Sequence, residues 1–357
     1  MKSYQIEKEF VLNYYRELDK AVGDQHYEIA NKYLADEYLW RGFHPFNEIN
    51  SSHEVMTSFW ITFKEAISRM QRRMDIFMAG ENSLETGGIW VVSMGHIMGL
   101  FDSHWLGIPP TGKMVFLRYC EFNRVENNKI CETAMYFDIP HLMMQVGINP
   151  FKSQTAAHLV QPGPLHHDGL MFEIQDEHES KKTLEAIDFM VEDIKGWSGG
   201  KEEPLVTELA RSWNDDMIWW GPAGIGATYT IERYAKQHSG PFREGLTDRH
   251  FNGHICRMSE GKFGGFFGWP NLTLRPTGGF MGMPASDKAA DMRVIDIYRR
   301  HEDKLTENWI FIDLLHFWNQ LGVDLLKRAV SNSNSCLLYT SDAADEGLGV
   351  DLGGRRI

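Results

Sequence analysis

The sequence lacks the patterns that mark several well-defined classes of protein. Its 357 residues include only four cysteines and no C-x-x-C pair, so we expect neither a disulfide framework nor a zinc site. No apolar run approaches the roughly 18 residues of a membrane span. The N-terminal stretch is charged and amphipathic, unlike a signal peptide. These absences favour a cytoplasmic protein with no membrane partner.

Positive charge and nucleotide-binding loops are also scarce. The formal net charge is −13, and the sequence has no dense cluster of Lys and Arg. We therefore expect no nucleic acid as a partner. There is no G-x-G-x-x-G after a strand, no Walker A and no G-x-S-x-G elbow. We therefore expect no cofactor and no metal. The histidines at 166, 167 and 178 are interpreted as solvated rather than metal-binding.

What the sequence does contain is an internal repeat. The segments FDIPHLMMQVG at 137–147 and IDLLHFWNQLG at 312–322 share the frame D-x-x-H-x-x-x-Q-x-G, 175 residues apart (313 minus 138). Over positions 107–147, 11 of 41 residues recur at this offset without a gap; average composition gives roughly two or three by chance. Upstream, DEYLWRG from Asp36 parallels DDMIWWG from Asp215 at an offset of 179. The chain is thus interpreted as two copies of one domain.

The repeat predicts the domain organisation. The first domain is expected at 1–150, a linker at 151–180 and the second domain at 181–335. The stretch 336–357 resembles the translation of a sequencing adapter, and we interpret it as a non-native tail from a fragmentary, metagenomic assembly. Without that tail the net charge is −11, because it holds four acids and two arginines.

Each copy has the same expected layout. Apolar positions at helical spacing predict a helix over 4–20, a short helix near 26–34 and another over 52–68. A strand is expected at 38–42, and four β-rich runs come after it, the last two joined by the hairpin signal Asn127–Asn128. Helices followed by a long antiparallel sheet indicate the α+β class. A bent sheet with helices across its open side would form a cone with an apolar interior.

These residues carry a family resemblance. Both copies have a G-x-P-x-[ST]-x-K entry to a strand, an acidic or amide hairpin turn, an aromatic-rich last strand, and then Asp followed by Q-x-G. This resembles the C-terminal half of a SnoaL-like polyketide cyclase domain, of the nuclear-transport-factor-2-like superfamily. The resemblance implies tandem cone-shaped α+β barrels. It also implies a cofactor-free carboxylate at the end of the last strand as acid/base, a role that falls on Asp138 and Asp313.

Two interpretations of these aspartates stay open. Each could be only a helix N-cap, with His141 and His316 in the first turn of the adjoining helix. Each could instead face the apolar cone, where desolvation would raise its pKa and suit it to proton transfer near neutral pH. Under the second interpretation the histidines join the catalytic group.

Further residues are candidates for binding a substrate. Period two places Tyr136 in one row with Asp138, and Trp309 and Phe311 in the matching row with Asp313. Such a row could line a pocket for a flat hydrophobic molecule or form ordinary core. The remaining candidates are Arg118 and Arg293, which could instead pair with Glu132 and Glu307, and Trp40 and Trp219, which could instead be core. His96, His104 and His254 are weaker candidates. Copy two is favoured because Ala134 stands in copy one where copy two has Trp309.

Two functions of different class agree with these observations. The first is a cofactor-independent acid/base enzyme acting on a hydrophobic, polyketide-like carbonyl compound, for example by aldol cyclisation or isomerisation. The second is a non-catalytic module that binds a small hydrophobic molecule. In either case the two domains could form a pseudo-dimer within one chain, with further oligomerisation possible.

Overall fold

Each half of the chain forms one sheet flanked by helices. The protein is seen in a computed structural model that describes residues 3–151, 153–157, 160–196, 201–328 and 331. The strand orders are β2-β1-β6-β5-β4-β3 and β10-β11-β12-β13-β7-β8, with β9 also paired to β11. The predicted α+β class and tandem duplication are confirmed. The adapter-like tail, 336–357, lies outside the described residues, so its interpretation stays a prediction.

The first repeat opens with two helices that lie over its sheet. Its elements are α1 (Gln5–Lys20), α2 (Gln25–Tyr33), β1 (Leu34–Gly42), β2 (Asn47–Ile49), α3 (Ser52–Val55), η1 (Met56–Ile61), α4 (Thr62–Ala66), β3 (Ile67–Glu81), β4 (Ile89–Phe101), β5 (Met114–Glu126), β6 (Lys129–Phe137) and α5 (Ile139–Gln145). The helix expected over 52–68 is present as three consecutive segments, the middle one with π-helical turns. The β5–β6 turn has positive φ at both Asn127 and Asn128, as a two-residue hairpin of this kind requires.

The second repeat has the same order of elements. They are α6 (Glu177–Lys195), α7 (Leu205–Ala210), β7 (Trp213–Trp220), β8 (Ala227–Tyr229), α8 (Ile231–Tyr234), η2 (Ala235–Ser239), α9 (Gly240–Gly245), β9 (Leu246–Phe251), β10 (Cys256–Glu260), β11 (Phe263–Pro276), η3 (Phe280–Gly282), β12 (Ala290–His301), β13 (Lys304–Ile312) and α10 (Leu314–Gln320). The repeats differ in one outer strand. Strand β3 is continuous over 15 residues, whereas residues 252–255 separate its counterparts β9 and β10. Among the described helices, none is long and apolar enough to cross a membrane.

Strand register fixes which residues of the two repeats are equivalent. In the parallel contact of β1 with β6, Trp40 pairs with Thr133. In the contact of β7 with β13, Trp219 pairs with Asn308. The first members lie 179 residues apart (219 minus 40) and the second 175 (308 minus 133), which are the two offsets of the sequence repeat. The offset of 179 therefore relates equivalent positions of β1 and β7, and the offset of 175 relates equivalent positions of β6 and β13.

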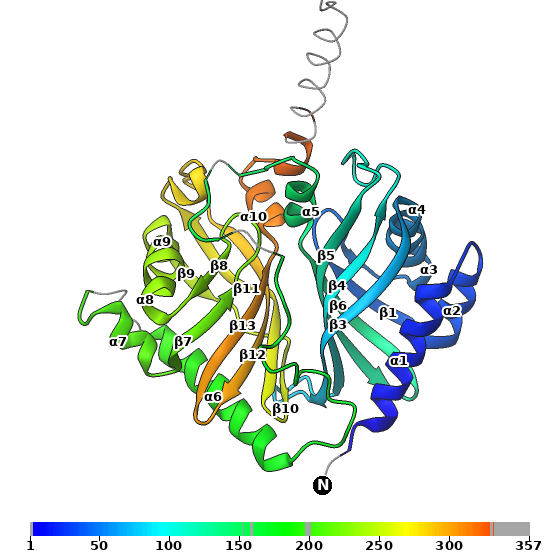
Figure 1. The fold of residues 1–357 in the computed structure, drawn as a ribbon, viewed down its shortest axis with the longest axis horizontal. Coiled ribbons are helices and arrows are strands. Elements are labelled where there is room, and N and C mark those ends of the chain that lie inside the picture. Colours follow the sequence, from blue (N-terminus) through cyan, green and yellow to red (C-terminus); the bar gives the residue numbers. More distant parts are fainter. Residues whose placement is uncertain (1–2, 152, 158–159, 197–200, 329–330, 332–357) are drawn as a thin grey trace, which may run out of the picture.

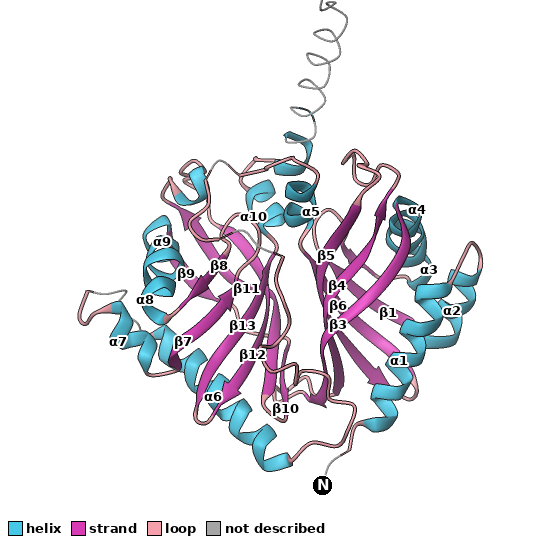
Figure 2. Ribbon diagram, in the orientation of Figure 1, coloured by secondary structure: helices cyan, strands magenta, loops and turns pink. Residues whose placement is uncertain are grey.

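The two sheets face each other across the centre of the molecule, and the helices α1–α4 and α6–α9 lie on the outer sides (Figures 1 and 2). Ring contacts join the facing surfaces, with centroids 5.3 Å apart for Phe122 and Phe267 and 5.9 Å for Tyr136 and Trp269. This leaves the opposite surface of each sheet to face its own helices.

The repeated aspartates join the two halves. Asp138 caps α5 by accepting from the His141 amide at 3.0 Å, and its other oxygen accepts from the Ala223 amide of the second repeat at 2.9 Å. Asp313 makes the same two contacts in reverse, with the amides of His316 at 3.1 Å and His44 at 2.9 Å. Ala223 and His44 are themselves equivalent (223 minus 44 is 179). The D-x-x-H frame thus forms a reciprocal cross-link between the repeats.

Replacing either aspartate by alanine should destabilise the fold. Asp138→Ala removes the cap of α5 and leaves the Ala223 amide buried without an acceptor, so we expect a loss of about 2–4 kcal/mol in urea unfolding. Asp138→Asn retains one acceptor oxygen and should cost less. Asp313→Ala is the matched variant and should behave alike. A loss under about 0.5 kcal/mol, the usual scatter of neutral surface changes, would refute the cross-link.

Candidate functional site

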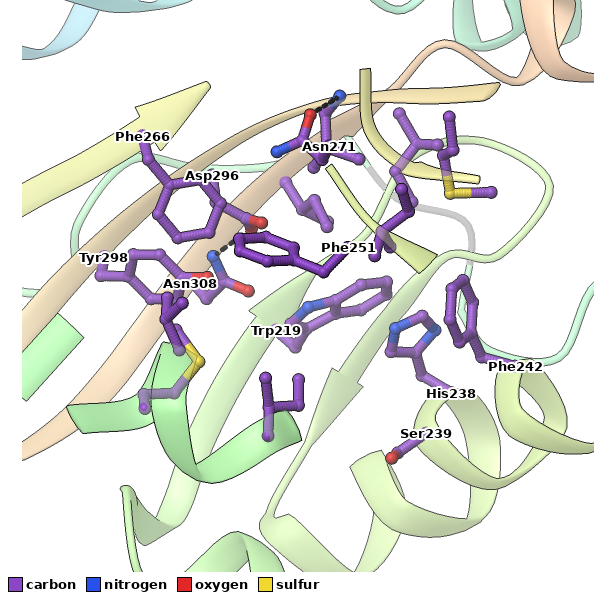
Figure 3. A pocket seen from close by; sticks show the side chains of 18 of the residues that line it. Trp219, His238, Ser239, Phe242, Phe251, Phe266, Asn271, Asp296, Tyr298 and Asn308 are labelled. Atoms are coloured by element: carbon purple, nitrogen blue, oxygen red, sulfur yellow. Dashed lines mark hydrogen bonds between the residues drawn. The ribbon is translucent and has the colours of Figure 1, made fainter. Parts of the chain in front are cut away.

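A cavity of about 470 Å³ lies in the second repeat, between its sheet and the helices α6, η2 and α9. This volume is in the range of small-molecule sites. The apolar wall includes Trp219, Phe242, Phe251, Phe266, Ile310 and Ile312. The polar side chains on the wall include His238, Ser239, Asn271, Asp296, Tyr298 and Asn308. Figure 3 shows Asp296, Tyr298 and Asn308 on the sheet side, with His238 and Ser239 on the helical side.

Asp296 is the carboxyl group of this cavity. It lies in the middle of β12 and is buried. Burial raises its pKa from 3.8 to about 7, an effect that hydrogen bonds from Asn308 and Tyr298 only partly offset. The Asn308 Nδ2 atom donates to Asp296 Oδ1 at 3.0 Å and to the Ile297 carbonyl at 3.0 Å. The carboxyl group is therefore held in one orientation and can exchange a proton near neutral pH.

Asn271 supplies a hydrogen-bond donor on the same wall. It lies in an irregular stretch of β11, between Gly268 and Leu272, where pairing with β12 shifts register. Its Oδ1 atom accepts from the Val294 amide at 2.8 Å, which orients the Nδ2 group. That Nδ2 group is buried and has no hydrogen-bond partner in the described part of the chain. Val294 and Asp296 are two positions apart on one strand face, about 7 Å along the strand.

Two histidines on the wall are held neutral. The His238 ring stacks on Trp219 at 3.9 Å between centroids, and the His254 ring stacks on Phe266 at 3.8 Å. Burial, together with the smaller effect of Arg243 on His238 and of Arg257 on His254, lowers the pKa of each to about 3. The Nδ1 atom of His238 is buried and, among the described residues, has no hydrogen-bond partner. Neutral imidazoles can bind a ligand without carrying charge into the cavity.

The first repeat fills the equivalent space with larger side chains. Ser239 on the wall corresponds to Trp60 at the offset of 179, and Val294 corresponds to Tyr119 at 175; both of these large side chains are buried. Ile312 likewise corresponds to the buried Phe137. At these three positions the lining of the cavity is smaller than its counterpart in the first repeat, which leaves room on this part of the wall.

An arginine completes the filling of the first repeat. Arg72 pairs with Ile97 in its sheet as Phe251 pairs with Leu272, so Arg72 and Phe251 are equivalent. The Arg72 guanidinium lies 4.1 Å from the Tyr15 ring centroid and 3.1 Å from Glu121, the counterpart of Asp296. The carboxylate of the first repeat is therefore neutralised by a buried cation. Asp296 has no such partner among the described residues of the cavity wall.

The aspartates expected at the site do not line this cavity. Asp138 and Asp313 lie at the contact between the repeats, where each accepts from two backbone amides. Burial raises the pKa of Asp313 to about 6, although Arg293 lies 3.5 Å away. His141 and His316 contribute their backbone amides to the caps. The catalytic assignment of these four residues stays a prediction, and the geometry gives both aspartates a complete structural role.

The predicted aromatic row faces the linker and the other repeat rather than the cavity. The Trp309 indole donates to the Pro162 carbonyl at 3.1 Å, and the Tyr136 hydroxyl donates to the Gly268 carbonyl at 3.1 Å. Phe311 lies under the Arg118 guanidinium at 3.9 Å. The alternate residues Asn308, Ile310 and Ile312 of β13 line the cavity instead. The alternation was predicted; the assignment of this row to a substrate pocket stays a prediction, and the geometry gives the row a packing role.

The arginines do not form the ion pairs that were considered as an alternative. Arg118 donates to the carbonyls of Ile310 and Trp220 at 2.8 and 2.9 Å. Arg293 stacks on Trp269 at 3.7 Å and donates to Asn47 at 2.8 Å. Both side chains therefore serve the contact between the sheets. Burial lowers the pKa of Arg118 to about 10.

Of the predicted binding residues, Trp219 lines the cavity, and so does His254 among the weaker candidates. Trp40 is buried against Phe46 and Phe59 in the first repeat. Asp296, Asn271 and Asn308 were not predicted from the sequence. A signal for Asp296 was present, because an acid in the apolar run RVIDIY matches Glu121 in RYCEF at the offset of 175.

The comparisons with known proteins agree with this architecture. The family model of SnoaL-like polyketide cyclases matches residues 13–146 and 271–321, together more than half of the chain. Among curated proteins, none matches the chain.

Solved structures with similarity to the chain include three from bacteria. AclR from Streptomyces galilaeus is 17% identical over 41% of this chain and 83% of its own, with a TM-score of 0.34. A SnoaL-like protein from Jannaschia sp. CCS1 is 16% identical over 41% and 95%, with a TM-score of 0.33. An NTF2-like protein from Burkholderia thailandensis E264 is 17% identical over 41% and 98%, with a TM-score of 0.30. On the family match, the chain belongs to the SnoaL-like polyketide cyclases, a membership that supports a small-molecule-binding or cyclase-type function.

Proposed function

We propose that the second repeat binds a flat, hydrophobic carbonyl compound and converts it by cofactor-independent acid/base catalysis, as in an aldol cyclisation or an isomerisation. The observation that carries the proposal is a buried carboxyl group with a pKa near 7 on the wall of a largely apolar cavity. A carboxyl group with this pKa is populated in both protonation states at neutral pH, as a group that accepts and returns a proton must be.

In this proposal Asp296 takes a proton from a carbon next to a carbonyl group. The carbonyl oxygen accepts from the Asn271 Nδ2 group, which has no partner among the described residues and so can stabilise the negative charge that develops on the oxygen. In a cyclisation the carbanion then attacks a second carbonyl carbon of the same molecule, and Asp296 returns its proton to the new alkoxide. In an isomerisation the proton returns to a different carbon.

The other polar residues of the sheet position the acid/base. Asn308 and Tyr298 bond the Asp296 carboxyl group, so it does not rotate between accepting and returning the proton. The aromatic wall of Trp219, Phe251 and Phe266 would stack on a planar substrate and exclude water. The first repeat acts as a structural partner, because its equivalent carboxylate, Glu121, is paired with Arg72.

Filling the cavity tests where ligands bind. A panel of polyketide-like and small aromatic carbonyl compounds would be screened by thermal shift, since a ligand at 100 times its Kd adds roughly 2.7 kcal/mol of stability. Ser239→Trp introduces the residue that the first repeat has there, Trp60, and should abolish the shift for each compound that stabilises the native protein. Val294→Tyr, which introduces the counterpart Tyr119, should do the same.

The control for this screen is Ser103→Trp, which adds the same side chain at an exposed position of the first repeat. It should leave every ligand-induced shift unchanged. Shifts that survive both filling variants would place binding outside the cavity and overturn the proposal. Compounds that bind in the cavity but are never converted would instead favour the non-catalytic binding module.

A further inference from the structure

Cations line the cavity on its solvent-exposed side, which we take as its opening. Lys195 at the end of α6, Arg243 on α9 and Arg249 on β9 all line it, and Asp296 is the only acid among the described residues that do. Lys195 and Arg249 are exposed and Arg243 is half-buried, whereas Asp296 is buried at the inner wall. This arrangement is opposite in sign to the chain as a whole, whose formal net charge is −13. A positive opening on an acidic protein attracts anions selectively.

Neighbouring acids offset part of this charge. Lys195 lies 2.6 Å from Glu192, but both side chains are exposed and such pairs are weak. For Arg243, burial lowers the pKa, the adjacent Arg249 lowers it further, and Glu208 raises it by less. The two arginines therefore repel each other, while Glu208 attracts Arg243. An anion placed between Arg243 and Arg249 would relieve that repulsion.

The lining has a cationic part and an apolar part. Such a lining suits a molecule with an anionic end and an apolar body. Phe242 is adjacent to Arg243 in the chain, and Phe251 is two residues from Arg249, so each arginine comes with an aromatic ring on the wall. Guanidinium groups bind carboxylates through paired hydrogen bonds, more strongly where apolar neighbours exclude water. The interior beyond them includes the donor Asn271 and the acid/base Asp296.

We infer that the substrate of this cavity carries an anionic group of the carboxylate type on its apolar body, bound at the opening by Arg243 and Arg249. This inference rests on the proposed function and specifies its substrate class. The anionic group fixes the direction of entry, because the apolar body must then lie inward, with its carbonyl group toward Asn271 and Asp296. Neutral analogues enter the same cavity but bind more weakly.

A pair of isosteric fluorescent probes tests the inference. Anthracene-2-carboxylate and anthracene-2-carboxamide have the same body and nearly the same shape, and they differ in charge. We expect the carboxylate to bind at least about tenfold more tightly at low ionic strength, a preference that shrinks in roughly 0.5 M salt because exposed charges are screened. Arg249→Ala, at an exposed position, should reduce the preference severalfold, while Lys236→Ala, an exposed lysine on η2 outside the lining, should not.

The outcomes separate this inference from the proposed function. Equal affinities for the two probes, both lost in Ser239→Trp, would overturn the anionic substrate and leave the cavity as the binding site. A carboxylate preference unchanged by Arg249→Ala would also overturn it, since the anion would then bind elsewhere. Failure of both probes to bind, or binding indifferent to Ser239→Trp, would overturn the proposed function together with this inference.

Discussion

Asp296→Asn is expected to lower turnover of a substrate bound in the cavity by about 10²–10⁴-fold, the usual contribution of a positioned acid/base. Asparagine has the shape of aspartate, and its Oδ1 atom can still accept from Asn308 Nδ2. It cannot take up a proton. Ligand affinity should therefore stay within about threefold of the native value, because the loss lies in the chemical step. Product formation and thermal shift, measured on one preparation, separate the two effects.

The control is the same substitution at the aspartate that the family resemblance favours. Asp313→Asn also removes a buried carboxyl group, but one whose oxygens accept from the amides of His44 and His316 at the contact between the repeats. It should reduce stability and leave turnover of the folded protein near the native rate. The reverse pattern, with activity lost in Asp313→Asn and kept in Asp296→Asn, would return the acid/base to the end of the last strand.

Much of the fold could be predicted from the sequence because the internal repeat implies two domains of similar structure. A match at offsets of 175 and 179 requires two similar domains, and the strand register of Trp40 and Trp219 has the same offsets. The glutamines of the repeated frame have the same role in both copies. Gln145 bonds the backbone of Phe116, and Gln320 bonds that of Asp291, near the start of the equivalent strands β5 and β12.

The site was harder to predict because a strand has two faces and alternation does not say which face meets the cone. The row with Trp309 and Phe311 is apolar because it packs against the linker and the other repeat, and such a buried contact needs the same residues as a pocket wall. Only the tertiary arrangement decides between them. Copy two was favoured because of Trp309, whose indole instead bonds Pro162.

Replacing Asp296 should also give a gain in stability that depends on pH. Folding raises the pKa of Asp296 from 3.8 to about 7. The folded state thus favours the protonated form, so the stability contribution of this group is complete below about pH 4 and is lost as pH rises through 7. Asparagine does not titrate. Asp296→Asn should therefore match the native stability near pH 4 and exceed it by about 4 kcal/mol at pH 8.

His238 should show the opposite dependence. Its folded pKa is about 3 against an ordinary value of 6.5, so its stability contribution is complete above pH 6.5 and is lost as pH falls. His238→Phe introduces the equivalent residue of the first repeat, Phe59, which can keep the stack on Trp219 without titrating. Relative to the native protein, this variant should gain roughly 3 kcal/mol between pH 6.5 and pH 4.

Urea unfolding of both variants and the native protein from pH 4 to pH 8 checks the two predictions. For each variant, the native free energy of unfolding is subtracted at each pH, so that the other ionisable groups cancel. The sign for Asp296→Asn carries more weight. A difference that stays constant with pH would mean that the Asp296 carboxyl group ionises in the folded protein as it does in water. At neutral pH it would then be a fixed anion with little tendency to hold a proton. Such a group could accept a proton from an acidic carbon only weakly, and the catalytic proposal would lose the property on which it depends.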